Sequence, residues 1–143
     1  MRILGLDVGT KRTGVAVSDE LLCTAQGLDS IECGTAVQDV ERIARLVEQH
    51  GVERIVVGLP LNMDGTEGAK ASQVRAFIAM LSARVGVPVE TWDERLTSMQ
   101  ADRILLEADL SRRKRRTLSD KVAAQLILQG YLDARRSKSQ ERQ

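Results

Sequence analysis

The first third of the chain carries its apolar residues in short blocks. Residues 2–8 and 13–18 are two such blocks, separated by the polar stretch GTKR, and a third covers roughly residues 21–31. Val15 and Val17 alternate with small residues, which is typical of a strand, and the short connection favours an antiparallel pair. We therefore expect three strands before the first helix.

The hydrophobic period changes at Thr35. Beyond it, apolar residues recur at the three- and four-residue spacing of a helix that is buried on one side. Thr35 and Gln38 have the form of a capping box, and Gly51 offers the left-handed conformation in which many helices end. The pattern predicts a helix that ends near His50.

Strand and helix patterns alternate through the rest of the chain. Ile55–Val57 is a continuous β-branched run, which is typical of a strand covered on both faces. The remaining elements expected from the pattern are a helix over 69–85, a strand at 87–92, a helix over 97–108 and a last helix over 119–134. This order predicts an α/β domain at residues 1–135, with a mixed sheet and helices on both faces. Residues 136–143 lack an apolar face and are expected to form a disordered tail.

Composition narrows the class of protein. The 143 residues suffice for one domain, and no apolar run approaches the ~20 residues of a membrane-spanning helix. The start lacks the segments of a secretory leader, so we expect a soluble cytoplasmic protein without a membrane partner, in which Cys23 and Cys33 are reduced. Aromatic residues make up only 2% of the chain, which argues against a platform of aromatic side chains for base stacking.

Acidic residues stand where the predicted strands end. Asp7 ends the first strand, Asp93 and Glu94 follow the fifth, and Asp120 opens the last helix. In open α/β sheets, ligands bind beyond the carboxyl ends of the parallel strands. Carboxylates gathered there repel one another unless a cation lies between them, and Mg²⁺ or Mn²⁺ prefers such oxygen ligands. We expect a metal site at this edge if the fold brings these ends together, which spacing alone does not establish.

Asp120 has two interpretations. It shares a helical face with Ala124, Ile127 and Tyr131, which would turn it toward the sheet as a metal ligand. It is equally well explained as an acid at the start of a helix, capped by Ser119, where it favours the helix dipole. The hypothesis that Asp120 is a metal ligand depends on whether the fold brings it close to the acids at the strand ends.

A dense basic cluster precedes Asp120. Residues 111–121 contain six basic side chains and one acid, although the whole chain has a formal net charge of only +1. The basic cluster proper consists of Arg112, Arg113, Lys114, Arg115 and Arg116. It is either a solvated linker or a track for nucleic-acid phosphates, and its position beside a predicted metal ligand favours the track. Lys11 and Arg12 add positive charge directly after the first strand.

Four motifs resemble the YqgF or RuvX family, whose members are described as Holliday junction resolvases and pre-16S ribosomal RNA nucleases. They are LDVGTKRTGVAVSD, IVVGLPLNMDGTEG, DERLTS and LSDKVAAQLIL, in matching order and spacing from residue 2 to residue 132. The resemblance implies the ribonuclease H-like fold with a five-stranded mixed sheet. It also implies hydrolysis of phosphodiester bonds with divalent metal ions, with Asp7, Glu94 and Asp120 as the acidic site and Asp93 as a close neighbour.

The resemblance leaves several roles open. Two Mg²⁺ or Mn²⁺ ions about 4 Å apart, bridged by Asp7, would activate a water and stabilise the leaving oxygen. Either Asp93 or Glu94 would be the second direct ligand. In GLPLNMDGTEG, Asn62 could contact phosphate or sugar, or the segment could be a plain connection closed by glycines. Arg95, in DERLTS, is a further candidate for contact with nucleic acid.

Two other functions fit parts of the sequence. LDVGT also resembles the first phosphate loop of actin-like and sugar-kinase ATPases, which close two such domains over ATP, whereas this chain provides one. A non-catalytic nucleic-acid-binding factor of ribosome assembly would keep the fold, but acids beside its phosphate track would repel the ligand. The sequence does not distinguish structured RNA from branched DNA, internal from terminal cleavage, or a monomer from the homodimer that a resolvase needs for paired cuts.

Overall fold

Five strands form a single mixed sheet, as the sequence predicted. The strands are β1 (Arg2–Val8), β2 (Arg12–Ser18), β3 (Ala25–Glu32), β4 (Val52–Leu59) and β5 (Val89–Asp93), in the order β3-β2-β1-β4-β5. β1 pairs antiparallel with β2 and parallel with β4, and β4 pairs parallel with β5. The carboxyl ends of β1, β4 and β5 therefore meet at one edge of the sheet, which we call the carboxyl edge.

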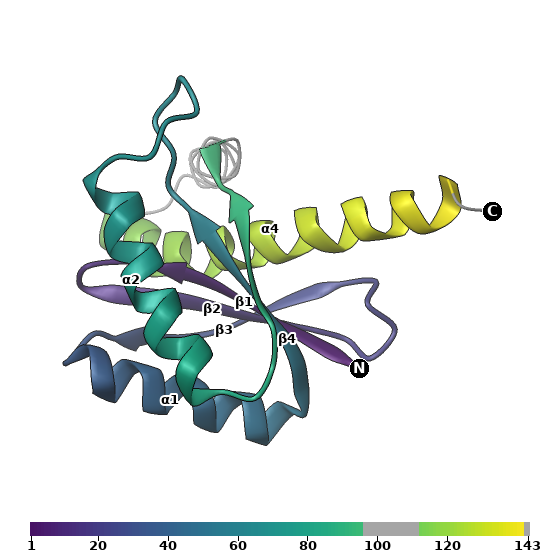
Figure 1. Cartoon of the computed structure of the whole chain (residues 1–143), viewed down its shortest axis with the longest axis horizontal. Coiled ribbons are helices and arrows are strands. Elements are labelled where there is room, and N and C mark those ends of the chain that lie inside the picture. Colours follow the sequence, from purple (N-terminus) through teal and green to yellow (C-terminus); the bar gives the residue numbers. More distant parts are fainter. Residues whose placement is uncertain (96–111, 142–143) are drawn as a thin grey trace.

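The computed structural model describes residues 1–95 and 112–141, with side chains described for residues 1–95 and 121–137. Within these ranges the helices are α1 (Ala36–His50), α2 (Ala69–Arg84) and α4 (Arg112–Glu141). α1 and α2 cover one face of the sheet and α4 covers the other (Figure 1), which confirms the predicted layers. The helix predicted over 97–108 lies outside the described residues.

The first helix has the ends that its sequence predicted. The Thr35 hydroxyl accepts a hydrogen bond from the Gln38 N–H at 3.2 Å, and the Gln38 side chain accepts one from the Thr35 N–H at 3.1 Å. The capping box is therefore complete. Gly51 follows the helix with φ 62°, a left-handed conformation that glycine adopts without a steric penalty.

Strand side chains alternate between two cores, because successive residues of a strand point to opposite faces. On β4, Ile55 and Val57 pack in the core under α1 and α2, whereas Val56 packs under α4. On β1, Ile3 belongs to the core under α4. By the same alternation, Asp7 lies on the α4 face of the sheet.

α4 runs antiparallel to β3. In the first half of the helix, Lys121 pairs with Asp29 of β3 at 3.4 Å. Two turns later, Gln129 donates a hydrogen bond to the carbonyl of Cys23, which precedes β3, at 3.0 Å. Since β3 and β1 are both antiparallel to β2, the beginning of α4 lies toward the carboxyl edge. Asp120 immediately precedes Lys121 and lies inside this helix, which begins at Arg112. The prediction that Asp120 opens the last helix, and its interpretation as an acid at the helix start capped by Ser119, are therefore wrong.

α4 is longer than the sequence predicted. Arg112–Arg116, expected in a linker, are helical, and the helix continues to Glu141, past the boundary at residue 135 where we expected a disordered tail. Neither extension contains proline, and arginine, lysine and glutamine are good helix formers, so nothing in the local sequence ends the helix earlier. The C-terminal end of α4 extends beyond the sheet (Figure 1), where it needs no apolar face.

The structure also bears on the expectations for the cysteines and for membrane-spanning helices. Cys23 and Cys33 are free and half-buried, as expected. No helix in the described ranges is long and apolar enough to span a bilayer.

Candidate active site

Asp7 and Glu94 meet at the carboxyl edge. Asp7 is the second-last residue of β1, and Glu94 directly follows β5. β4 lies between these two strands, so the Glu94 side chain must cross β4 to reach Asp7. The two carboxyl groups share a side-chain hydrogen bond. The fold thus joins two acids that are 87 residues apart in sequence, as predicted.

Gly58 of β4 opens the path between the two acids. A Cβ added at Gly58 would lie 2.4 Å from Glu94 Oε2 and 2.5 Å from Ile127 Cδ1 of α4, closer than such atoms approach in proteins. A larger residue at this position would force the end of the Glu94 or Ile127 side chain to move, whereas glycine leaves room for the carboxylate as it lies. Gly58 was not among the predicted site residues, although a glycine directly after the β-branched run of a buried strand is a signal for such a close approach.

Burial and the neighbouring Asp7 both disfavour the ionised form of Glu94. Burial raises the pKa of Glu94 to about 7, and the charge and hydrogen bond of Asp7 act in the same direction. The nearby ammonium of Lys70 opposes this rise. In the absence of a cation, Glu94 therefore holds a proton well above the pH at which an ordinary glutamate loses it.

Asp93 has a different environment although it is the next residue. The Arg95 guanidinium donates two hydrogen bonds to Asp93 Oδ2, from Nε at 2.9 Å and from Nη2 at 2.6 Å. These bonds lower the pKa of Asp93, whose side chain is exposed. Of the two acids considered as partners of Asp7, only Glu94 faces it; Asp93 is neutralised by its own arginine.

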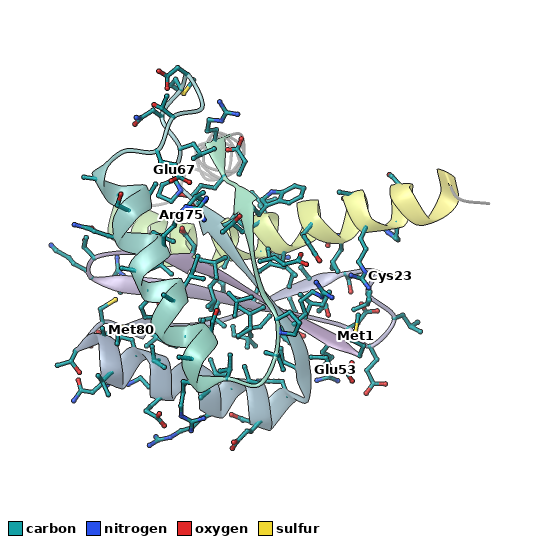
Figure 2. All side chains as sticks on the ribbon, viewed as in Figure 1. Met1, Cys23, Glu53, Glu67, Arg75 and Met80 are labelled. Atoms are coloured by element: carbon teal, nitrogen blue, oxygen red, sulfur yellow. The ribbon has the colours of Figure 1, made fainter. Side chains whose placement is uncertain are left out.

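The segment after β4 is a small hairpin that projects beyond the sheet (Figure 1). Asn62 Nδ2 donates to Thr66 Oγ1 at 3.0 Å, and Arg95 Nη1 donates to the carbonyl of Met63 at 3.2 Å. At the base of the hairpin, Arg75 Nε donates to Glu67 at 2.6 Å (Figure 2). Asn62 and Arg95 therefore both hold the hairpin in place, and their contact with nucleic acid stays a prediction.

The structure gives the place of the other predicted site residues in the fold but few of their side-chain contacts. Lys11 is exposed in the turn between β1 and β2, and Arg12 begins β2. Asp120 and the basic cluster lie in the first turns of α4, toward the carboxyl edge, and their side chains lie outside the described residues. Among the described residues, no group of three potential metal ligands is found. Asp7 and Glu94 form a group of only two.

The pair nevertheless fits a hard divalent cation. It offers carboxylate oxygens that are close enough to repel each other, next to backbone that ends a strand. Mg²⁺ and Mn²⁺ bind through one or two such carboxylates and complete their shell with water and phosphate oxygens. Lys70, which sequence analysis also missed, adds a positive charge from the first turn of α2.

Comparisons with known proteins agree in sequence and in fold. The family model described as RuvX, Holliday junction resolvase, matches residues 1–134. A candidate pre-16S rRNA nuclease of Symbiobacterium thermophilum is 54% identical over 141 residues, which are 99% of this chain and 98% of that protein. One of Moorella thermoacetica is 58% identical over 133 residues, covering 93% and 95%. The structure of T. thermophilus RuvC in complex with a Holliday junction substrate matches with a TM-score of 0.61 at 18% identity, over 96% of both chains. The fold is thus ribonuclease H-like.

Proposed function

The chain belongs to the RuvX family of Holliday junction resolvases, and from this membership we propose that it is a divalent-metal-dependent nuclease that hydrolyses phosphodiester bonds in structured nucleic acid. The meeting of Asp7 and Glu94 at the carboxyl edge carries the proposal. A protein that only bound nucleic acid would gain nothing from two carboxylates forced together where phosphates must approach.

Asp7 and Glu94 are the proposed metal ligands, with Asp120 as the third carboxylate. The antiparallel course of α4 over the sheet supports this role for Asp120, because it directs the start of the helix to the same edge. Mg²⁺ or Mn²⁺, as two ions in the two-metal scheme, would supply an activated water and charge stabilisation at the leaving oxygen. Asp93 would act from outside the ligand set, by fixing Arg95.

The remaining side chains of the site would bind and orient the substrate. The charge of Lys70, in the first turn of α2, acts on Glu94, so Lys70 could bind a phosphate oxygen near the reacting phosphodiester. The basic cluster, Lys11 and Arg12 extend positive charge along the same edge for the flanking phosphates. Contacts of this kind to phosphates would position the strand without reading its sequence.

The names of the relatives suggest two substrates that present the same phosphodiester. One is the precursor of 16S ribosomal RNA and the other is a four-way DNA junction. Cutting a junction symmetrically would require two copies of the chain related by a two-fold axis. Cleavage of each substrate by the purified protein would assign the reaction. The molecular mass of the protein in solution would show whether it forms the dimer that symmetric cutting requires.

The decisive test is Asp7→Asn, with Asp133→Asn as the matched control. Asp133 is hydrogen-bonded to Gln129 at 3.0 Å on the far part of α4. With Mn²⁺ or Mg²⁺, we expect Asp7→Asn to lose roughly 10³-fold or more in cleavage rate, because it removes charge that the transition state requires. Binding of the substrate should persist or tighten, and Asp133→Asn should cleave normally. Full activity of Asp7→Asn, or equal activity in excess chelator, would refute the metal mechanism.

A further inference from the structure

A concave site lies near the acid pair, on the α1 and α2 face of the sheet. It is a cavity of about 380 Å³ between the end of β1, the connection from β3 to α1, and one side of α2. Most of its wall is carbon, and Phe77 and Met80 of α2 form part of it; Figure 2 labels Met80 on α2. Its volume is at the lower end of the range for small-molecule sites, so it suits one ring system and not a longer segment.

Asp39 gives this apolar cavity one strongly polar point. The residue is only 8% exposed and lines the cavity from the first turn of α1. Its Oδ1 accepts a hydrogen bond from the Gly34 N–H at 3.0 Å and lies 4.0 Å from Arg42 Nη1. Among the described residues, Oδ2 has no donor. A ligand in the cavity that carries a hydrogen-bond donor could therefore bind to this carboxylate, which can accept further hydrogen bonds.

The cavity is joined to the acid pair by a short stretch of chain and by one side chain. Val8, Gly9 and Thr10 line the cavity and directly follow Asp7. Lys70 also lines the cavity, while its charge acts on Glu94. A phosphate held at the acid pair and a group held in the cavity would therefore lie on the two sides of the carboxyl edge, with Lys70 between them.

We propose that this cavity binds the base of a nucleotide next to the cleaved phosphate, and that Asp39 selects a base with an exocyclic amino group. The proposal rests on the proposed nuclease function and gives that site a preference at one nucleotide. The base would lie against Phe77, since an aromatic ring stacks on any base. The single polar contact would then decide among bases of the same shape.

Cytosine and uracil make the sharpest comparison. They have the same ring size, but cytosine carries an amino donor at N4 where uracil carries the O4 acceptor. An ionised Asp39 only accepts hydrogen bonds, so it pairs with cytosine and repels uracil. Asp39→Asn can keep the bond from Gly34 through its amide oxygen and present an NH₂ donor to the cavity. That substitution should reverse the preference.

The direct test measures binding of cytidine and uridine 5′-monophosphate to the full chain without metal, by calorimetry or ligand-observed NMR. We expect the wild type to bind the cytidine nucleotide about tenfold more tightly, and Asp39→Asn to prefer the uridine nucleotide. Asp64→Asn, in the exposed hairpin, is the control and should bind like the wild type. Equal binding of the two nucleotides by the wild type, or no binding of either, would overturn the proposal even if Asp39→Asn does not fold. A preference unchanged in folded Asp39→Asn would overturn it as well.

A second measurement separates this inference from the nuclease proposal. Oligonucleotides that differ only by cytosine or uracil at each position around the cut are cleaved by the wild type and by Asp39→Asn. One position should show the preference and its reversal. Cleavage without a reversible preference at any position would refute the base site and leave the nuclease intact. Binding with the expected reversal but no cleavage would instead support the base site and refute the nuclease.

Discussion

β5 presents two glutamates four residues apart whose surroundings differ completely. Glu90, within the strand, forms an ion pair with Arg54 and accepts a hydrogen bond from the Tyr131 hydroxyl at 2.7 Å. Glu94, just past the end of the strand, faces Asp7 in a partly buried space. One glutamate has partners that favour its charge, and the other has a neighbour that opposes it.

The difference separates a structural acid from a functional one. Glu90 ties β5 to β4 through Arg54 and to α4 through Tyr131, whose ring also packs edge-on against Trp92 with centroids 6.0 Å apart. Its contacts are complete within the protein. The two carboxyl groups of Asp7 and Glu94 oppose each other's negative charge, and Lys70 offsets this only in part, so a bound cation would stabilise the fully ionised pair.

The largest expected effect contrasts these two glutamates in catalysis. Glu94→Gln should lower the cleavage rate by about 10²–10³-fold, because the pair loses one ligand charge. Glu90→Gln should retain a rate close to that of the wild type, although it loosens the contact with Arg54. The measurement is single-turnover cleavage at saturating Mn²⁺ with both variants shown to be folded. Equal losses in the two variants would mean that the contrast in surroundings has no bearing on catalysis.

Gly58→Ala tests whether the path to Asp7 must stay open. The added methyl group meets Glu94 Oε2 and Ile127 Cδ1, so the carboxylate must shift. A displacement of this kind costs about 10²-fold in rate, and the crowding costs about 1–3 kcal/mol of stability. Gly86→Ala is the control, since nothing lies within 4 Å of a Cβ at that position. Wild-type cleavage by Gly58→Ala would show that Glu94 need not cross β4.

The stability of the metal-free protein should depend on pH through Glu94. Its folded-state pKa of about 7 lies above the ordinary value of 4.5, so between these values the folded protein binds more protons than the unfolded chain. Stability should therefore fall as pH rises from about 4.5 to 7, by on the order of 1–2 kcal/mol after allowance for solvent screening. Urea unfolding in chelator measures the fall. In Glu94→Gln the free energy of unfolding should depend less on pH, and Mg²⁺ should restore the stability of the wild type at pH 8. A wild-type free energy of unfolding that does not change between pH 4.5 and 7 would contradict the raised pKa of Glu94.

The sequence predicted those parts of the molecule that depend on local pattern. The β-branched run at Ile55–Val57 and the capping box at Thr35 determine their elements through neighbouring residues, and both are confirmed. The conjunction of Asp7 with Glu94 was also predictable, because parallel strands in an α/β fold end at one edge.

The parts that the sequence did not reveal depend on contacts across the fold. Whether Asp93 or Glu94 faces Asp7 is decided by Arg95, which binds Asp93, and by the room above Gly58. The role of Lys70 depends on where the first turn of α2 lies relative to β5. The extra length of α4 was missed for another reason: a helix that extends past the sheet has no apolar face, and hydrophobic periodicity cannot detect it.

The smallest effect concerns the two ends of α4, which are both basic. Replacing Arg112, Arg113 and Arg115 by alanine removes charge near the carboxyl edge, whereas replacing Arg135, Arg136 and Lys138 removes the same charge from the end that extends beyond the sheet. If the first set binds phosphates, affinity should weaken for every DNA or RNA, and the slope of log affinity against log salt should become shallower by about one unit for each phosphate that is no longer neutralised. The maximal rate should survive, because these side chains stabilise the bound substrate and the transition state equally. Salt titrations of both triple variants make the measurement, and identical slopes for the two would show that the basic cluster is only a solvated part of the helix.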